Sequence, residues 1–456
     1  MKRRNFVRRT ALAGLGLASS SVVSLARRAN FLPNKVPAQA ITSGEQQHWF
    51  GYYDKWQVDP SGRYALGNQV DLFFRSPTPE DTLKMGLIDL ENNNTWTEIG
   101  QSSAWGWQQG CMLQWVPGSS EEVIWNARRG DARSENTFVS IICNINTGQR
   151  RILPHPVYTL SPDGKTGFGI DFARLQFFRP GYGYATSDKS VPRKAPADTG
   201  IYRLDLQTGE KQLVLSYAQV AQIDRPLGSV ADNYHWVNHL LVNPAGNRLI
   251  FLNRSRPYPT PEEYRKETGK SLRGDDLYVT RAITVNTDGS DLYALNDSGM
   301  FSHFIWNGDD ALCAWAKPEV ARPGLAPLEA GSPEGSDQAA FYVFQDRSKQ
   351  YEIVCEEAMT VNGHNTYVPH TNNEWILNDT YPQGDERMQE LYLYHVPSQR
   401  KVVLGRFHEP AKFKGEWRCD LHPRCNQQGT KVYFDSTHEG SKRQMYEINI
   451  EEIIRA

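Results

Sequence analysis

The chain has 456 residues and carries 50 Lys and Arg against 52 Asp and Glu, a formal net charge of −2. A nucleic-acid binder would be expected to show a basic footprint, so we expect no nucleic-acid partner. Its 21 Tyr, 18 Phe and 12 Trp, with 36 Gly and 26 Pro, favour many short strands joined by turns over a helical bundle. The length alone fits either several domains or one all-β repeat domain.

The first 40 residues are typical of a targeting segment. Arg3, Arg4 and Phe6 form a twin-arginine pattern, and an apolar run of small residues follows over 11–26. The sequence 38–40 is Ala-Gln-Ala, a small-residue cleavage site. We therefore expect residues 1–40 to direct export by the twin-arginine route to the periplasm or the exterior. A signal anchor is the alternative, but small residues make a weak span, so we expect no stable membrane insertion after processing.

A repeated unit organises residues 41–456. In its clearest copy, residues 239–253, a histidine precedes a short apolar run, a Pro/Gly turn and a second apolar run. A unit that recurs along the chain in this way indicates one supersecondary unit per copy, here a four-stranded antiparallel blade. The sequence therefore predicts an all-β, seven-bladed β-propeller, whose last blade is completed by the segment before Tyr52. The seven turns lie at Pro60, Pro117, Pro162, Pro244, Gly308, Pro369 and Gln427.

Six cysteines are too few for a disulfide scaffold in a chain of this length. Buried free thiols are one interpretation. A bridge is the other, with Cys419 and Cys425 the nearest pair in sequence.

Four of the 11 histidines share one position in the repeat: His239, His303, His364 and His422. We expect them to line the mouth of the central channel as a metal or catalytic site. The alternative is that they are structural residues that tie neighbouring blades together. Asp420 stands two residues before His422, and imidazole with carboxylate suits a divalent metal such as Mn or Zn.

Arginines follow the second strands of blades two to four. Guanidinium groups bind carboxylate or sulfate in a bidentate manner, so we expect an anionic ligand at the histidine face. A solvated rim is the alternative for any one of them. Trp107 is a candidate for stacking on a sugar, although tryptophan also packs between blades. The arginines on these loops are Arg128, Arg129, Arg174, Arg179, Arg254 and Arg256.

Three of the histidine segments are similar to motifs of the seven-bladed oligogalacturonate lyases: HLLVNP at His239, SHFIW around His303 and DLHPR around His422. The resemblance covers mainly blades four to seven. It implies metal ligation by His303 and His422 and an acid/base role for His239. Two positions differ, because Asp420 stands where those lyases have a histidine and Trp417 where they have a glutamine. Blades one and two resemble instead a large group of exported bacterial propellers.

The sequence thus favours an exported polysaccharide lyase that cleaves an acidic, uronate-containing oligosaccharide by metal-assisted β-elimination. In this hypothesis His239 is the base, His235 or Tyr53 the acid, and Arg128 or Arg254 helps the metal to stabilise charge. His303 and His422, with Asp420 or His364, hold the metal. The alternative is a non-catalytic propeller that binds a glycan or an envelope protein. Hydrolysis is not favoured, since the sequence has no GxSxG motif.

Overall fold

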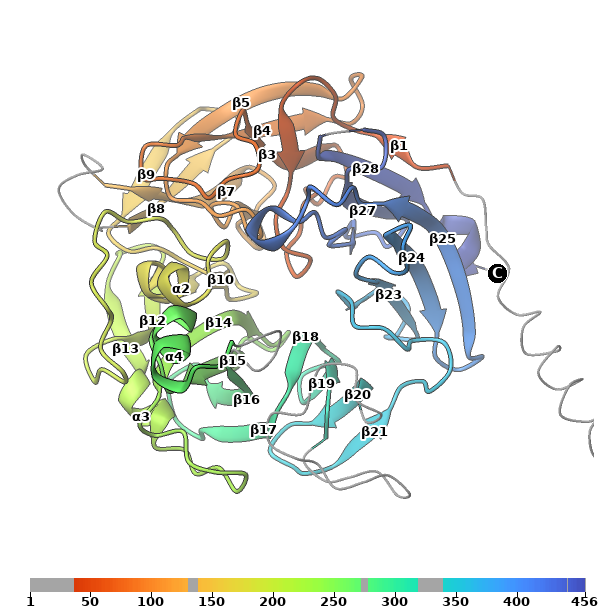
Figure 1. The fold of residues 1–456 in the computed structure, drawn as a ribbon. Coiled ribbons are helices and arrows are strands. Elements are labelled where there is room, and N and C mark those ends of the chain that lie inside the picture. Colours follow the sequence, from red (N-terminus) through yellow and green to blue (C-terminus); the bar gives the residue numbers. More distant parts are fainter. Residues whose placement is uncertain (1–36, 130–137, 272–277, 319–338, 441, 456) are drawn as a thin grey trace, which may run out of the picture.

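The computed structural model describes residues 37–129, 138–271, 278–318, 339–440 and 442–455. Residues 1–36, which carry the twin-arginine pattern, lie outside the described residues. The described chain forms seven four-stranded antiparallel sheets arranged as a ring (Figure 1). This confirms the predicted seven-bladed β-propeller.

Each blade is a meander in which consecutive strands pair. Blades one to three contain β2 (Gln47–Trp49), β3 (Tyr64–Val70), β4 (Leu83–Asp89) and β5 (Thr95–Ser102); β6 (Gln114–Trp115), β7 (Glu122–Arg128), β8 (Phe138–Asn144) and β9 (Arg150–Leu153); and β10 (Thr159–Leu160), β11 (Thr166–Gly169), β12 (Gly200–Asp205) and β13 (Lys211–Ser216). Blades four and five contain β14 (Tyr234–Val242), β15 (Arg248–Arg256), β16 (Val279–Asn286) and β17 (Tyr293–Gly299); and β18 (Phe301–Trp306), β19 (Ala311–Ala316), β20 (Ala340–Gln345) and β21 (Tyr351–Ile353). Blade six contains β22 (Thr366–Tyr367), β23 (Trp375–Asp379), β24 (Met388–His395) and β25 (Arg400–His408), and blade seven contains β26 (Arg424–Cys425), β27 (Lys431–Ser436) and β28 (Gln444–Asn449).

The two ends of the chain close the ring. Strand β1 (Gln39–Ala40) pairs antiparallel with β28 and supplies the fourth strand of blade seven. The backbone N–H of Ile41 then donates to the Met445 carbonyl at 2.8 Å. This confirms the expected closure by the N-terminal segment. The propeller starts before residue 41, because β1 lies within the segment assigned to the signal.

The predicted turns join the first and second strands of the blades. In the turn at Pro244, the Asn243 side-chain oxygen accepts the backbone N–H groups of Asn247 and Arg248 at 3.0 and 2.9 Å. Gly246 adopts a φ of 78°, a left-handed conformation that favours glycine. The side chain thus satisfies the N–H groups of the turn, so this sequence signal fixes where the second strand begins.

Buried apolar side chains pack between neighbouring blades. In one such cluster Val368 and Leu377 of blade six lie with Phe434 and Tyr446 of blade seven. All six cysteines are free thiols, and Cys419 is buried. The structure therefore supports the free-thiol interpretation, and burial of the apolar faces, rather than cross-linking, holds the ring together.

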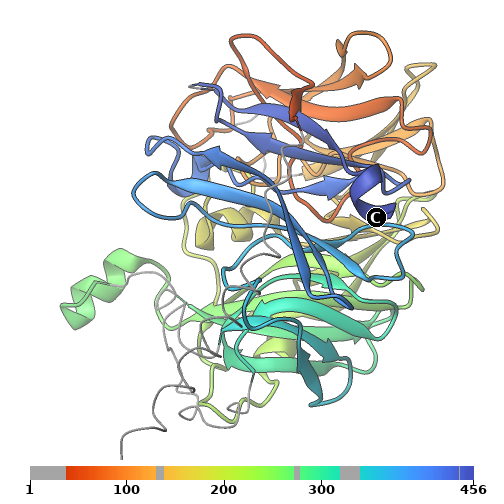
Figure 2. The same ribbon diagram turned by 90° about the vertical axis from the view of Figure 1, so that its right-hand side faces the viewer.

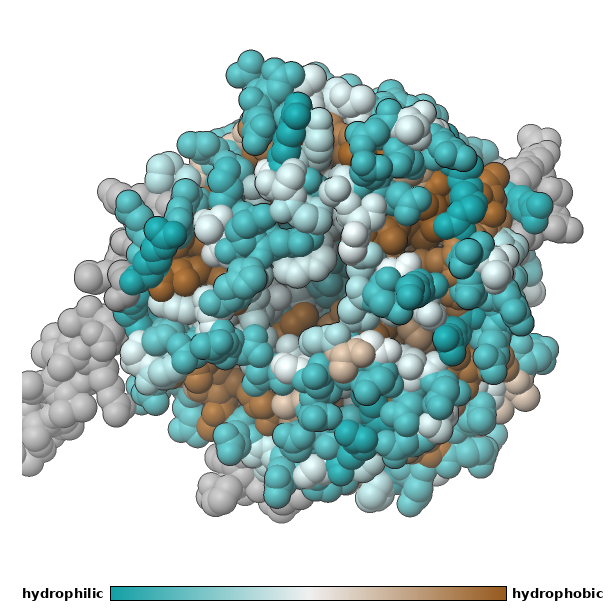
Figure 3. Space-filling model, turned by 180° about the vertical axis from the view of Figure 1, so that it is seen from behind, coloured by the Kyte–Doolittle hydropathy of each residue, from teal (hydrophilic) through white to brown (hydrophobic). Residues whose placement is uncertain are grey.

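The described part of the chain has few and short helices: α2 (Phe172–Phe178), α3 (Tyr217–Ala221), α4 (Pro261–Thr268), α5 (Glu451–Arg455) and the 3-10 turn η2 (Gly415–Trp417). Helices α2 and α4 are inserted between the second and third strands of blades three and four. They lie on the face where the innermost strands begin, and α4 projects from it (Figure 2). The opposite face, which carries the predicted turns, is mainly hydrophilic and hollowed at its centre (Figure 3). Of the described helices, none has the length and apolar character needed to cross a membrane.

Candidate metal and anion site

A loop of blade one closes the central channel. Tyr52 and Tyr53 lie in this loop, and both side chains are buried. The Tyr53 hydroxyl accepts from the Phe304 backbone N–H and donates to its carbonyl, each at 2.9 Å. The Tyr52 ring lies 4.9 Å from the ring of His239 and 5.0 Å from that of His422. The two tyrosines therefore form a floor that the histidines surround.

The structure brings the four histidines of the repeat together. The rings of His303 and His364 lie 4.0 Å apart, and those of His364 and His422 lie 4.3 Å apart. His239 stacks on Phe304 at 3.9 Å, with its Nε2 3.6 Å from Asp54 Oδ2. All four are buried. Four consecutive blades therefore contribute one imidazole each to a single cluster.

Three of the predicted metal ligands converge on one point. His364, Asp420 and His422 each offer an atom within 4.8 Å of the others. The Nε2 atoms of His364 and His422 are buried without a hydrogen-bond partner among the described residues. Nδ1 of His364 lies 3.0 Å from Asp379, so in the neutral ring Nδ1 donates to the carboxylate and Nε2 is free to bind a metal. His303 lies beside this trio but is not part of it.

Burial and neighbouring charges shift the pKa values of the clustered imidazoles. It lowers the pKa of His303 and His422 well below the usual value, and the neighbouring His364 lowers both further. Burial also lowers the pKa of His364, but Asp379 outweighs it and raises that pKa overall. Neutral imidazoles are the form that binds a metal. His422 is therefore held in a metal-binding state, as is His303 beside the trio.

The donor set fits a divalent transition metal. Two imidazole nitrogens and a carboxylate are ligands that suit Zn or Mn, and buried nitrogens without partners are costly unless something binds them. Asp379 would orient the His364 ring, as carboxylates do behind metal-bound histidines. One competing contact exists, because Arg418 Nε lies 2.8 Å from Asp420 Oδ2.

A pocket of about 290 Å³ opens beside the cluster. His303 forms part of its wall, with its Nε2 3.4 Å from the hydroxyl of Tyr381. Three arginines line it, and none of the described residues that line it is an Asp or Glu. The pocket is therefore positively charged. Its arginine and tyrosine lining consists of Arg179, Arg254, Arg418, Tyr52, Tyr182, Tyr278 and Tyr381.

The arginines are held by neutral partners as well as by Asp420. Arg254 donates to the Asn238 side chain at 3.1 Å, and Arg179 donates to the Tyr278 hydroxyl. Arg418 donates to the Tyr182 hydroxyl at 2.7 Å. Nε of Arg179 is buried without a hydrogen-bond partner in the described structure. These guanidinium groups are thus pre-positioned for an anion.

Several predicted site residues lie elsewhere. His235 is buried within blade four, where its nitrogens face the Val230 carbonyl at 2.8 Å and the Asn253 side chain. Arg174 donates to the His235 and Lys194 carbonyls, both at 2.6 Å. These contacts satisfy the side chains inside the protein.

The remaining candidates also have packing partners. Arg256 donates to the Pro259 carbonyl, and Arg128 donates to the Ala185 carbonyl at 2.6 Å. Arg129 is exposed and lines a separate pocket of about 330 Å³ on blade two. Trp107 is 1% exposed, so its faces are already covered. Of the predicted arginines, Arg179 and Arg254 line the pocket beside the histidines.

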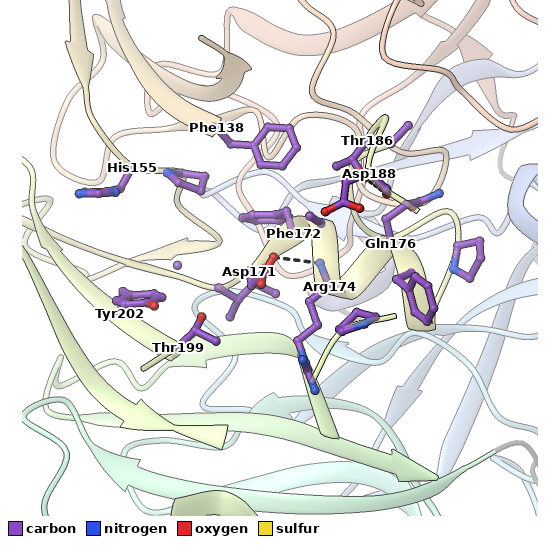
Figure 4. A pocket seen from close by; sticks show the side chains of 18 of the residues that line it. Phe138, His155, Asp171, Phe172, Arg174, Gln176, Thr186, Asp188, Thr199 and Tyr202 are labelled. Carbon is purple, nitrogen blue, oxygen red and sulfur yellow. Dashed lines mark hydrogen bonds between the residues drawn. The ribbon is translucent and has the colours of Figure 1, made fainter. Parts of the chain in front are cut away.

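A larger pocket, of about 830 Å³, lies over blade three (Figure 4). Helix α2 and the segment after it form one side, with Phe172 and Asp188, and Tyr202 and His155 lie on the other. Asp171 caps α2 by accepting the backbone N–H of Arg174 at 2.9 Å. None of the four central histidines lines this pocket. The larger pocket is therefore separate from the histidine cluster.

The sequence-based prediction missed four residues that shape the site: Arg418, Tyr182, Tyr381 and Asp379. Asp379 is the last residue of the second strand of its blade, and Asn126 and Asn253 lie within the second strands of blades two and four. A polar residue thus recurs in these strands, but its distance from the turn differs between the blades, so the repeat alone did not single out Asp379. The other three lie in irregular segments, so their positions cannot be predicted from the repeat.

The fold and site define a seven-bladed propeller with a buried histidine–aspartate cluster beside an arginine-lined pocket. In fold the chain is similar to an oligogalacturonate lyase from Vibrio parahaemolyticus, at 13% identity over 92% of this chain and 95% of that one, with a TM-score of 0.59. It is also similar to a prolyl endopeptidase, at 10% identity over 96% of this chain and 54% of that one, with a TM-score of 0.50. At these identities the similarities concern the fold. The suspected resemblance to the lyases is thus confirmed at that level. No family model matches the chain, and no curated protein does.

Proposed function

We propose that this protein is an exported polysaccharide lyase that cleaves uronate-containing oligosaccharides by metal-assisted β-elimination. The observation that carries the proposal is the juxtaposition of the His364–Asp420–His422 cluster with a pocket lined by three arginines and no described carboxylate. A pocket with this charge selects an anionic ligand. The resemblance of the histidine motifs to those of oligogalacturonate lyases supports the same reaction class.

β-Elimination from a uronate needs its carboxylate neutralised, because the proton on C5 becomes acidic only when negative charge on the carboxyl group is stabilised. Arg179 and Arg254 supply fixed positive charge on one side of the pocket. His364, Asp420 and His422 would hold the metal, with His303 beside them. When bound, a divalent metal acts as a Lewis acid toward the carboxylate.

The position of His239 argues against proton transfer by this residue. Its ring is fully buried, it stacks on Phe304 and its Nε2 faces Asp54. It does not line the pocket. Tyr53 is likewise occupied by the Phe304 backbone. Both support the floor of the site, so the base and acid belong to the pocket wall.

The test is a panel of pectic, ulvan-like and glycosaminoglycan oligomers, offered to metal-loaded protein and followed by the ultraviolet absorption of the 4,5-unsaturated product. We expect absorption to rise with at least one oligomer. Chelation should abolish the signal and added Mn or Zn restore it. A metal-loaded protein that is silent on the whole panel would contradict the proposal.

The second candidate is a non-catalytic propeller that binds an acidic glycan. It is favoured by the ion pair of Arg418 with Asp420 at 2.8 Å, which offsets the charge of a candidate metal ligand without a metal. Elemental analysis separates the two. Folded protein without stoichiometric metal, which binds uronides equally well after His422→Ala, would favour simple binding.

A further inference from the structure

We propose that Tyr182 is the proton-transfer residue of this site, in place of a histidine. The inference rests on the proposed lyase function. Tyr182 lines the pocket of arginines, and its hydroxyl accepts a hydrogen bond from Arg418 at 2.7 Å. Its ring packs under the guanidinium of Arg179, 4.8 Å from the ring centroid. The hydroxyl is thus placed where the pocket would hold a carboxylate-bearing sugar.

The loop that carries Tyr182 is fixed by close backbone packing. Gly183 lies against α2 so tightly that a Cβ there would be 2.2 Å from the Phe172 carbonyl oxygen. On the other side, Gly181 has a φ of 93° and its carbonyl accepts the Gln108 backbone N–H at 3.0 Å. The two glycines therefore allow a close approach that holds the tyrosine between them. A proton-transfer group needs such pre-organisation.

The surroundings make the phenolate form of Tyr182 more accessible than that of an ordinary tyrosine. Burial alone would raise the pKa of Tyr182, but Arg418 and Arg179 outweigh it and lower that pKa to about 8. Asp420 acts in the opposite direction. The other titratable neighbours are the tyrosines Tyr52 and Tyr158 and the imidazole of His364. A base with a pKa close to the working pH is the most effective.

The step balances without a co-reactant. The Tyr182 phenolate takes the C5 proton of the uronate, and the C5–H electron pair forms the C4=C5 double bond. The C4–O bond breaks and its electron pair leaves with the departing sugar oxygen. Tyr182, now a phenol, gives the same proton to that oxygen and is regenerated. No water is consumed, and the products are an unsaturated uronide and a free hydroxyl end.

The test compares wild-type protein with Tyr182→Phe and with Tyr184→Phe. Tyr184 lies in the same loop but outside the pocket, where its hydroxyl is bonded to Asn126 at 2.7 Å. On the uronide that gives the wild-type signal, we expect Tyr182→Phe to lower kcat by about 10²–10⁴-fold, the usual contribution of a general base. Metal content and thermal unfolding should not change. Tyr184→Phe should keep the wild-type kcat.

A pH profile of activity distinguishes proton transfer from a structural role, because a purely structural residue would not set the pH at which activity rises. Activity should rise as pH passes the pKa of Tyr182, and Arg179→Gln should shift that acid limb upward by about one unit or more, because a stabilising charge is lost. If wild-type protein is active and Tyr182→Phe keeps more than a tenth of kcat, the assignment is overturned and the lyase function stands. If wild-type protein is silent on every oligomer, both proposals fall.

Discussion

Asp379 holds His364 at two points. Its Oδ1 accepts the backbone N–H of His364 at 2.6 Å, and its carboxylate accepts Nδ1–H of the same residue at 3.0 Å. One carboxylate at the end of β23 thus fixes the position, the rotation and the tautomer of the imidazole. When the ring is neutral, its Nε2 is available to the cluster with Asp420 and His422.

We therefore expect Asp379→Asn to weaken metal binding by about 10–100-fold, the usual effect of removing the carboxylate behind a metal-bound histidine. Titration calorimetry with Mn and Zn measures it. Asp435→Asn is the matched control, since Asp435 is also buried in the second strand of its blade but pairs with Arg424 at 2.9 Å. Equal affinity in wild-type protein and Asp379→Asn would show that His364 is not a ligand.

The pocket arginine Arg254 gives a second prediction. Arg254→Gln should raise KM for a uronide more than it lowers kcat, by about tenfold or more, because a charge-assisted contact to the carboxylate is lost. Arg256→Gln, two residues along β15, is the control, since Arg256 packs on Phe178 and Trp236 outside the pocket. Steady-state kinetics with both variants should separate them. A change in Arg256→Gln equal to that in Arg254→Gln would contradict the assignment.

Glu409 gives a prediction on stability against pH. Burial, followed by the nearby Asp420, raises the pKa of Glu409 from 4.5 to about 7. The folded protein therefore binds more protons than the unfolded chain between these values. Its contribution to stability is complete below pH 4.5 and falls by about 3 kcal/mol as pH rises through 7. Glu409→Gln, which keeps a neutral acceptor for the Cys419 N–H, should flatten this dependence in urea unfolding. If stability depends on pH with the same slope in Glu409→Gln as in wild-type protein, a group other than Glu409 is responsible for that dependence.

Ring closure gives the fourth prediction. Ile41 is 2% exposed and follows the strand that completes blade seven. Ile41→Ala should lower the free energy of unfolding by about 2–5 kcal/mol, the range for removing a buried isoleucine side chain. Ile152→Ala is the control, because Ile152 is 64% exposed and the same truncation there should cost little. If both variants lose the same free energy of unfolding in chemical denaturation, closure of the ring by this segment does not contribute to stability.

The repeat in the sequence was enough to predict the ring. The turn chemistry at Pro244 and Gly246, and the apolar runs on either side, specify a hairpin through local conformational preference, and seven such hairpins can bury their faces only against each other. The same register assigned His239, His303, His364 and His422 to one position of the repeat. Their convergence followed because each blade presents the same position to the ring centre.

Which residues complete the site was decided by the tertiary structure. Arg418, Tyr182 and Tyr381 lie in irregular segments, whose paths depend on packing such as that of Gly183 on α2. The channel floor depends in the same way on Tyr53 reaching Phe304, 251 residues away in sequence. Contacts of this kind leave no periodic signal. The sequence by itself therefore determined the seven blades and the shared position of the four histidines. Only the tertiary structure decided which arginines and tyrosines surround those histidines.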